Sequence, residues 1–420
     1  MRVLEPKQLE QRRVERTQKY SKRRRKHRFS AVILIIVVLY IIGAILVPLP
    51  RLQANTAPIT APGGAPVSLP WPTYGQSAIG AVGYGLLDQH GDQRRVPIAS
   101  VAKVMTAVAV LKIKPIRPYE PGELLTITEE DVEVYNRYVA EGQSVVEVAA
   151  GEQLTEYQAL QALMLPSANN MAEVLARWAF GSIDNYITFV NPFTKTLGLE
   201  NTVIADASGY DAGTQSTAAD LTTLAEIAMN NPVLAEIVAQ PEANLPVAGT
   251  VYNVNNFLGR HGIVGIKTGT TDEAGGCYMF AARRQVASGE TVTVVGVIIG
   301  GDTRSRAMED SLPLIDEVFK GFQTTQPVAT GQVVGVVSRA SGGQAPIKVG
   351  RGLSVATWGN TMPRIEMTTK DIGGSVASGD EVGTLSVFVG NLRYDVPLIA
   401  GGDISDHSWL WRLRHAGGYL

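Results

Sequence analysis

A serine and a lysine three residues apart form the first pair in the sequence whose types could do chemistry together. Ser100 and Lys103 stand at the start of an apolar run, residues 101–107. If this run is helical, side chains three positions apart lie on one face and within reach of each other. A serine hydroxyl is a poor nucleophile at neutral pH, and an amine whose pKa is lowered by burial or by a second cation can take its proton. The same spacing occurs at an ordinary helix start with a solvated lysine, so the pair alone leaves both interpretations open.

A second hydroxyl follows in a Ser-x-Asn segment. Ser167 and Asn169 come directly after Pro166, which ends the helical composition of residues 155–165, and a helix resumes over residues 171–180. The pattern predicts a loop between two helices. Because the helices hold such a loop rigidly, it is a good place for a catalytic hydroxyl. The alternative is that Ser167 or Asn169 only caps the second helix, as both residue types routinely do.

A third segment combines a lysine, a threonine and a glycine. Lys267, Thr268 and Gly269 stand near the end of an apolar strand predicted over residues 262–269. Lysine beside threonine also occurs in phosphate-binding loops, but such loops need a glycine directly before the lysine, and Ile266 stands there. We therefore discard nucleotide binding for this segment.

In this order, the three segments resemble the motifs of the low-molecular-weight penicillin-binding proteins that act as D-alanyl-D-alanine carboxypeptidases. The resemblance runs from about residue 78 to residue 322 and is densest in residues 101–107, 167–170, 206–210, 216–220 and 265–276. It implies a β-lactamase/transpeptidase-like domain of the α+β class, in which an antiparallel sheet is combined with helices and a helical subdomain.

The resemblance also implies acyl transfer through a serine. Ser100 would attack the carbonyl carbon before the last D-alanine, and Lys103, as a neutral amine, would be its base. Lys267 would be the cation that lowers the pKa of Lys103. Ser167 would pass the proton to the departing amine, and Asn169 would hold Lys103 or the substrate backbone.

The resemblance also implies which residues bind the substrate: those of the predicted strand and one arginine. The backbone N–H groups of Ser100 and Thr270 would bind the oxyanion, at about 3 kcal/mol each. Arg306 is the candidate anchor for the substrate carboxylate, with Arg304 as the fallback, because the spacing after Gly301 can slip by two residues. The full substrate-binding set is Lys267, Thr268, Gly269, Thr270 and Arg306.

The composition predicts large folded domains and no nucleic-acid partner. Of 420 residues, 45% are apolar, and the formal net charge is -2. The lone Cys277 cannot form an internal disulfide and is interpreted as a small core residue. The five histidines are His27, His90, His261, His407 and His415. Their spacing is not that of metal ligands, so we expect no metal or other cofactor.

The N-terminal part predicts a membrane anchor. Residues 1–29 hold twelve Lys and Arg against three Glu, and residues 31–49 carry no charge. We expect a basic cytoplasmic segment over residues 1–29 and a transmembrane helix over residues 30–49, with the chain that follows outside the cell. A cleaved signal peptide is the competing interpretation.

Four further regions are expected after the membrane helix. Residues 50–72 are rich in proline and predict an extended linker. The serine D,D-peptidase domain would occupy residues 73–325, and short strands between glycine-rich turns predict a small all-β domain over residues 326–400. Residues 401–420 form a tail in which Trp409, Trp411 and Arg412 suit a membrane surface.

These expectations combine into a membrane-anchored D,D-carboxypeptidase of the bacterial cell surface. It would remove the terminal D-alanine from peptidoglycan stem peptides through an acyl-enzyme on Ser100, and β-lactams would be covalent inhibitors. The alternatives are a D,D-endopeptidase or a β-lactamase on the same scaffold, and a cell-wall-binding protein without turnover.

Overall fold

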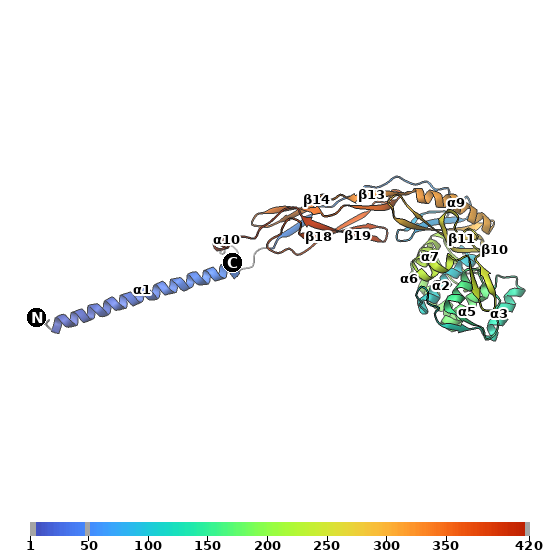
Figure 1. Ribbon diagram of the computed structural model, residues 1–420, viewed down its shortest axis with the longest axis horizontal. Coiled ribbons are helices and arrows are strands. Elements are labelled where there is room, and N and C mark those ends of the chain that lie inside the picture. Colours follow the sequence, from blue (N-terminus) through green and yellow to red (C-terminus); the bar gives the residue numbers. More distant parts are fainter. Residues whose placement is uncertain (1–5, 47–50, 416–420) are drawn as a thin grey trace.

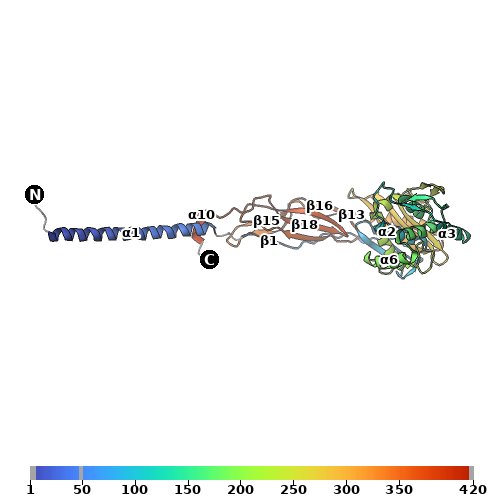
Figure 2. The ribbon, with the colours of Figure 1, turned by 90° about the horizontal axis from the view of Figure 1, so that it is seen from below.

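The molecule is elongated, with a long helix at one end and a larger head at the other. The structure is a computed structural model and describes residues 6–46 and 51–415. Helix α1 (Pro6–Leu46) leads into a narrow β-rich part, and the head of mixed helices and strands lies beyond it (Figure 1, Figure 2). All the candidate site residues lie in the head.

An antiparallel sheet of five strands, in the order β10-β11-β12-β2-β3, divides the head. The strands are β2 (Gln76–Ala81), β3 (Gly85–His90), β10 (Ile263–Thr271), β11 (Gly275–Gln285) and β12 (Thr291–Gly301). Successive side chains of a strand point to opposite faces, so Cys277 belongs to one apolar cluster and Tyr278 to another. Helix α7 (Ala218–Asn230) covers the first face and α9 (Arg304–Lys320) the second.

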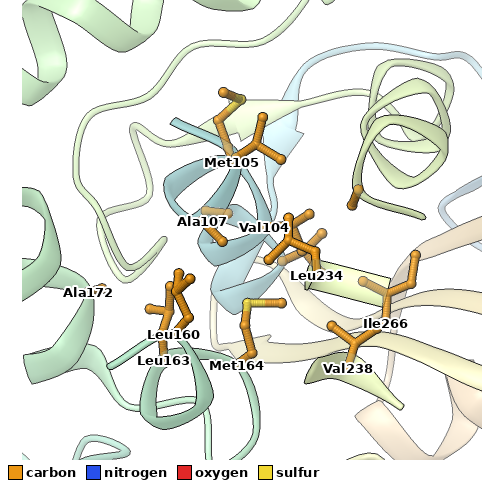
Figure 3. Close-up of a cluster of buried hydrophobic side chains, with 14 of the residues drawn as sticks. Val104, Met105, Ala107, Leu160, Leu163, Met164, Ala172, Leu234, Val238 and Ile266 are labelled. Atoms are coloured by element: carbon orange, nitrogen blue, oxygen red, sulfur yellow. The ribbon is translucent and has the colours of Figure 1, made fainter. Parts of the chain in front are cut away.

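The remaining helices of the head gather around a central buried helix. They are the 3-10 turn η1 (Ala99–Ala102), α2 (Lys103–Ile113), α3 (Glu129–Ala140), α4 (Glu156–Met164), α5 (Asn169–Phe180), α6 (Ile183–Thr196) and α8 (Pro232–Val238). Every residue of α2 from 103 to 111 is buried. Figure 3 shows Val104 of α2 in one apolar cluster with Leu163 of α4, Val238 of α8 and Ile266 of β10.

Local sequence explains where the helices around the Ser-x-Asn segment begin and end. Helix α4 begins at a capping box in which Thr155 and Gln158 bond to each other's backbone N–H groups. Its last residue is Met164, close to Pro166 as predicted. Short elements complete the head: β4 (Val96–Pro97), β5 (Leu124–Thr126), β6 (Gln153–Thr155), β7 (Gln215–Ser216), β8 (Glu242–Leu245), β9 (Gly249–Tyr252) and η2 (Arg260–Gly262).

The chain beyond the head is β-rich and has its own core. Strands β13 (Phe322–Val328) and β16 (Leu353–Trp358) pair as a ribbon next to α9. A six-stranded antiparallel sheet follows, built from β1 (Gln53–Thr56), β14 (Val333–Ser338), β15 (Gln344–Val349), β19 (Leu392–Ala400), β18 (Glu381–Val389) and β17 (Arg364–Thr369). Val337, Ile347 and Leu385 are fully buried in its core. The predicted α+β fold with a β-rich second part is thus confirmed, while the domain limits in the sequence stay predictions.

Part of the proline-rich segment 50–72 differs from the extended linker that its composition predicts, whereas residues 57–72 contain neither helix nor strand. Strand β1 pairs with β14 along its whole length, and Leu52 is buried beside it. Proline cannot donate to a sheet, but β1 contains none, and it occupies an edge of the sheet. Composition misled here because the apolar core against which this segment packs comes from residues more than 270 positions later.

Helix α1 runs without a break through the basic and the apolar part of the N-terminal region. Residues 13–46 include a window long and apolar enough to cross a membrane, and residues 47–49 of the predicted span lie outside the described residues. The short helix α10 (Trp409–His415) packs against the end of α1. Tyr40 Oη donates to the Leu413 carbonyl at 2.7 Å, and Arg412 Nη1 donates to the Ile45 carbonyl at 3.1 Å.

Candidate active site

The structure brings Ser100 and Lys103 together as their spacing predicts. Ser100 lies half-buried in η1, and Lys103 is the first residue of α2 and has no exposed surface. Lys103 Nζ lies 2.7 Å from Ser100 Oγ. The preceding residue, Ala99, has a φ of 47°, which is uncommon for a residue with a side chain. This turn therefore holds the hydroxyl in a backbone conformation that the surrounding packing has to support.

Lys103 has three oxygen neighbours. Besides Ser100 Oγ, its Nζ bonds to Asn169 Oδ1 at 2.5 Å and to the Ser208 carbonyl at 3.0 Å. Burial lowers the pKa of Lys103 to about 7, rather than the charge of Lys267 expected from the sequence, and the negative charge of Asp206 acts in the opposite direction. The amine is therefore neutral in a large share of molecules near neutral pH, and in that form it can accept a proton from the Ser100 hydroxyl.

The Ser-x-Asn loop delivers Asn169 to this lysine. The cap of α5 is Ala168, which makes no side-chain capping bond, so the interpretation of Ser167 or Asn169 as a simple helix cap is wrong. Asn169 instead bridges Lys103 and Gln143, whose Oε1 accepts from Asn169 Nδ2 at 2.5 Å. Ser167 is buried in the same loop with a φ of 67°, a second residue in the left-handed region.

Strand β10 places the Lys-Thr-Gly segment against the Ser100 turn. A Cβ atom on Gly269 would lie 2.8 Å from Ser100 N and 3.0 Å from Ala99 Cβ, so only glycine allows this approach. Lys267 is buried, and its Nζ donates to the Thr268 carbonyl at 2.9 Å. Burial first, and then the positive charges of Lys103 and Arg304, lower the pKa of Lys267 well below its ordinary value.

Beyond Lys267, the strand presents Thr270 to solvent. Thr268 is buried, whereas Thr270 is exposed, and its Oγ1 donates to the Gly269 carbonyl at 2.7 Å. Thr270 pairs with Gly276 of β11. Strand β10 is one of the two edge strands of the five-stranded sheet, and it approaches Ser100 at Gly269.

The structure does not place Arg306 with the other candidates. Its Nε donates to Asp310 Oδ2 at 2.8 Å on the exposed side of α9. Arg304 is the guanidinium close enough to affect the pKa of Lys267, and its backbone packs on Gly276, the partner of Thr270. Two positions along a helix are rotated by about 200°, so the two arginine side chains leave α9 in nearly opposite directions. The electrostatic effect on Lys267 favours Arg304, the fallback, and which arginine anchors the substrate carboxylate stays a prediction.

Three residues that touch the site were not among the candidates. Asp206 and Ser208 stand in a segment that resembles the family, and that resemblance could have identified them as site residues. No sequence feature points to Gln143, because it lies in an irregular stretch between α3 and β6. A cavity of about 160 Å³ adjoins the site and is lined by Tyr138, Asn169, Glu173, Ile183, Asp206, Ala207 and Ser208.

Comparison with protein families identifies residues 80–303 as a match to the peptidase S11 model, described as D-alanyl-D-alanine carboxypeptidase. Among curated proteins, the chain is 28% identical over 256 residues to the D-alanyl-D-alanine carboxypeptidase DacA of Escherichia coli K12, which covers 59% of this chain and 60% of that protein. It is 30% identical over 192 residues to a D-alanyl-D-alanine endopeptidase of Pseudomonas aeruginosa, which covers 44% of this chain and 58% of that protein. The chain thus spans about 60% of the length of the Escherichia coli relative.

Two solved structures share the fold. The Streptomyces K15 DD-transpeptidase is similar with a TM-score of 0.53 and 26% identity, over 60% of this chain and 98% of that one. A penicillin-binding protein 3 of Streptococcus pneumoniae, described as a peptidoglycan synthesis regulatory factor, has a TM-score of 0.62 and 18% identity, over 80% of this chain and all of the other. The second match extends into the β-rich part, and at that identity it concerns the fold alone.

Proposed function

Because the chain belongs to the D-alanyl-D-alanine carboxypeptidase family, we propose that it removes the terminal D-alanine from peptidoglycan stem peptides through an acyl-enzyme on Ser100. The observation that carries this proposal is the 2.7 Å contact between Ser100 Oγ and Lys103 Nζ, made by a buried lysine with a lowered pKa. A nucleophile beside a base of matched pKa is what acyl transfer needs.

In the first step, Ser100 Oγ attacks the carbonyl carbon before the last D-alanine while its proton moves to Lys103 Nζ. The negative charge that develops on the carbonyl oxygen is bound by the backbone N–H groups of Ser100 and Thr270. This assignment is supported by the contact of Gly269 with Ser100 N, which brings the strand to the turn. Each such donor contributes about 3 kcal/mol to the stability of the transition state.

In the second step, the bond to the last D-alanine breaks and its amine takes a proton. Ser167 relays this proton from Lys103, and Asn169 holds the lysine in place through the 2.5 Å bond to Oδ1. Water then hydrolyses the ester on Ser100, with Lys103 again as the base. The stem peptide leaves one D-alanine shorter.

The substrate carboxylate is held at the β10 edge. We assign this role to Lys267, Thr268, Gly269 and Thr270 of the strand and to Arg304. The exposed Arg304 is favoured over Arg306, whose side chain is engaged by Asp310. A cation with hydroxyl and backbone N–H donors is the usual partner of a free carboxylate.

The place of action is the outer face of a bacterial membrane. Helix α1 spans it once, with the basic residues before Ser30 in the cytoplasm and the head outside, near the cell wall. The proposal is supported by the apolar window in α1 and by the excess of Lys and Arg on one side of it. β-Lactams inhibit the protein by acylating Ser100.

The test is covalent labelling by a fluorescent penicillin, followed by mass spectrometry of the labelled peptide. The wild-type protein is expected to carry the label on Ser100, and Ser100→Ala is expected to lose it completely. The matched control is Ser378→Ala, which removes the hydroxyl of an exposed serine in the β-rich part and should keep full labelling. A wild-type protein that takes no label, or takes it on another residue, contradicts the proposal.

The alternatives differ from the proposal in their products. A curated relative is named as an endopeptidase, so opened cross-links are the second product to look for. Incubation with muropeptides distinguishes the reactions, because a carboxypeptidase releases free D-alanine, an endopeptidase opens cross-linked dimers, and a β-lactamase hydrolyses the drug. A labelled protein with none of these products would favour a cell-wall-binding role.

A further inference from the structure

The loop that brings the Ser208 carbonyl to Lys103 is folded around one carboxylate. Asp206 Oδ2 accepts hydrogen bonds from Ser208 N at 3.1 Å, from Ser208 Oγ at 2.6 Å and from Tyr210 N at 3.1 Å. Asp206 Oδ1 accepts from Gly209 N at 3.0 Å and from Thr214 Oγ1 at 2.6 Å. Both oxygens only accept, which is the pattern of an ionised carboxylate. Replacement by a neutral amide would turn an N–H₂ group toward one set of these donors.

The residues that follow Asp206 rest on the helix that carries Lys103. Thr106 Oγ1 donates to the Ala207 carbonyl at 2.7 Å, and Lys103 Nζ donates to the Ser208 carbonyl at 3.0 Å. Thr106 and Lys103 are three residues apart on α2 and therefore share a face. The loop thus touches α2 through two consecutive carbonyl groups.

Gly209 continues this contact onto the nucleophile turn. Its φ is 77°, and a Cβ atom there would lie 2.0 Å from the Ala99 carbonyl oxygen and 2.7 Å from Ala102 Cβ. Only a residue without a side chain fits between the loop and η1. Since Asp206 Oδ1 bonds to Gly209 N, the carboxylate also determines where the loop meets the turn of Ser100.

We propose that Asp206 is a positioning residue of the acyl transfer, which holds the Ser208 carbonyl on Lys103 and supplies the negative charge that faces the Lys103 amine. This inference rests on the proposed function and adds to it a residue outside the three motifs. Asp206 acts through the Ser208 carbonyl on Lys103 and through the contact of Gly209 with the turn of Ser100.

The electrostatic surroundings of Lys103 single out Asp206 among the neighbouring charges. Among the described residues, the charged and titratable groups that act on the site electrostatically or line the adjoining cavity are Asp206 of the loop, Lys267 of β10, Arg304 of α9, Tyr186 of α6, Tyr138 of α3 and Glu173 of α5. Glu173 is engaged by Arg137 and Arg177, each at 3.0 Å. Burial lowers the pKa of Lys103, and Asp206 is the group whose charge acts against this shift.

The charge of Asp206 is therefore expected to shift the pH dependence of acylation in a definite direction. Lys103 works as a neutral amine, so acylation of Ser100 rises with pH as Lys103 loses its proton, around pH 7 in the wild-type protein. Loss of the carboxylate charge favours the neutral amine and moves this rise to lower pH. Loss of the loop geometry alone lowers the acylation rate at every pH and leaves the pH of the rise unchanged.

The experiment compares the second-order rate of acylation by a chromogenic penicillin from pH 5 to pH 9, in the full-length protein in detergent. Asp206→Asn is expected to acylate at least about tenfold more slowly at pH 8, with the rise shifted down by about 1 pH unit. Asp206→Glu keeps the charge and displaces it, so we expect a slower rate with the rise at the wild-type pH. Asp92→Asn is the control, because Asp92 is exposed and pairs with Arg94, and it should match the wild type.

The outcomes separate this inference from the proposed function. An Asp206→Asn protein with the wild-type rate and pH dependence overturns the inference, and so does a slower rate without a shift, which would mean a structural role only. If Asp206→Asn fails to fold, as judged by circular dichroism, Asp206→Ser, which also removes the charge, decides: a slower rate with the rise at lower pH supports the inference, and an unshifted rise or the wild-type rate overturns it. A wild-type protein that is not acylated refutes the proposed function itself.

Discussion

Lys103 differs from an ordinary lysine because the fold removes it from water. Lys112, further along the same helix, is exposed, whereas Lys103 has no exposed surface and three oxygen neighbours. Desolvation disfavours the charged form of an amine, which is why its pKa falls toward neutrality. Lys267 is shifted in the same direction by burial and by the two nearby cations. At this scale, the chemistry depends on burial as much as on residue type.

The choice between the two arginines of α9 is testable by a pair of substitutions. Arg304→Ala is expected to raise KM for a peptide ending in D-alanyl-D-alanine by about 10- to 100-fold, because a charged hydrogen bond to a carboxylate contributes about 1.5–3 kcal/mol. Arg306→Ala should change KM less than about twofold, since its side chain is engaged by Asp310 on the exposed face. Steady-state kinetics of D-alanine release provide the measurement, and the reverse ranking would restore Arg306 as the anchor.

Strand β10 and the 3-10 turn η1 form the site by lying against each other. Gly269 is the point of closest contact, and the register of β10 with β11 determines which residues face the turn. The strand is held from behind by α8, where Val238 packs beside Gly265. Two elements separated by more than 160 residues in the chain thus share one catalytic geometry.

Gly269→Ala is expected to reduce acylation more than it reduces stability. The added Cβ would lie 2.8 Å from Ser100 N, so the strand must move away from the turn. Overpacking of this kind costs about 1–3 kcal/mol in stability, and a displacement of about 1 Å at a reacting centre costs about 100-fold in rate. Penicillin acylation and thermal unfolding measure the two effects.

The matched control for this substitution is Gly373→Ala, because a Cβ at Gly373 meets no atom within 4 Å. We expect the wild-type rate of acylation for this variant. An active Gly269→Ala protein would mean that the turn does not depend on the approach of β10.

The whole molecule connects helix α1 to the head by two paths. Residues after α1 enter the six-stranded sheet at β1, and the end of the chain returns as α10 to the last turns of α1 (Figure 1). The β-rich part lies between α1 and the head in both views (Figure 1, Figure 2). With α1 in the membrane as proposed, this arrangement favours a head held at a fixed height above the bilayer over one on a flexible linker.

Deletion of residues 409–420 tests that arrangement. We expect unchanged acylation by a soluble penicillin, because the candidate site lies in the head. We also expect a wider distribution of distances between the head and the bilayer, since the contacts of Arg412 and Leu413 with α1 are lost. Fluorescence energy transfer from a head-attached dye to labelled lipids measures this distribution. Deletion of residues 416–420 alone keeps α10 and serves as control, and equal distributions in all three proteins would contradict the two-path attachment.

Local patterns in the sequence predicted the elements and much of the chemistry. The helix ends around Pro166, the strand that carries Lys267 and the apolar span of α1 all follow from composition over short windows. The pairing of Ser100 with Lys103 follows from helical spacing within one segment. The functional roles of these residues stay predictions until the labelling experiment is done.

The sequence by itself determined which residue types are available for acyl transfer and in what order they stand, because motif spacing is a property of single segments. Only the tertiary structure decided that Lys103 is buried, that Asn169 joins it to Gln143, that the Asp206 loop brings the Ser208 carbonyl to it, and that β1 joins a sheet. Each of these depends on contacts between segments distant in the chain. Burial, desolvation and helix rotation arise from such packing, and no short window of sequence contains them.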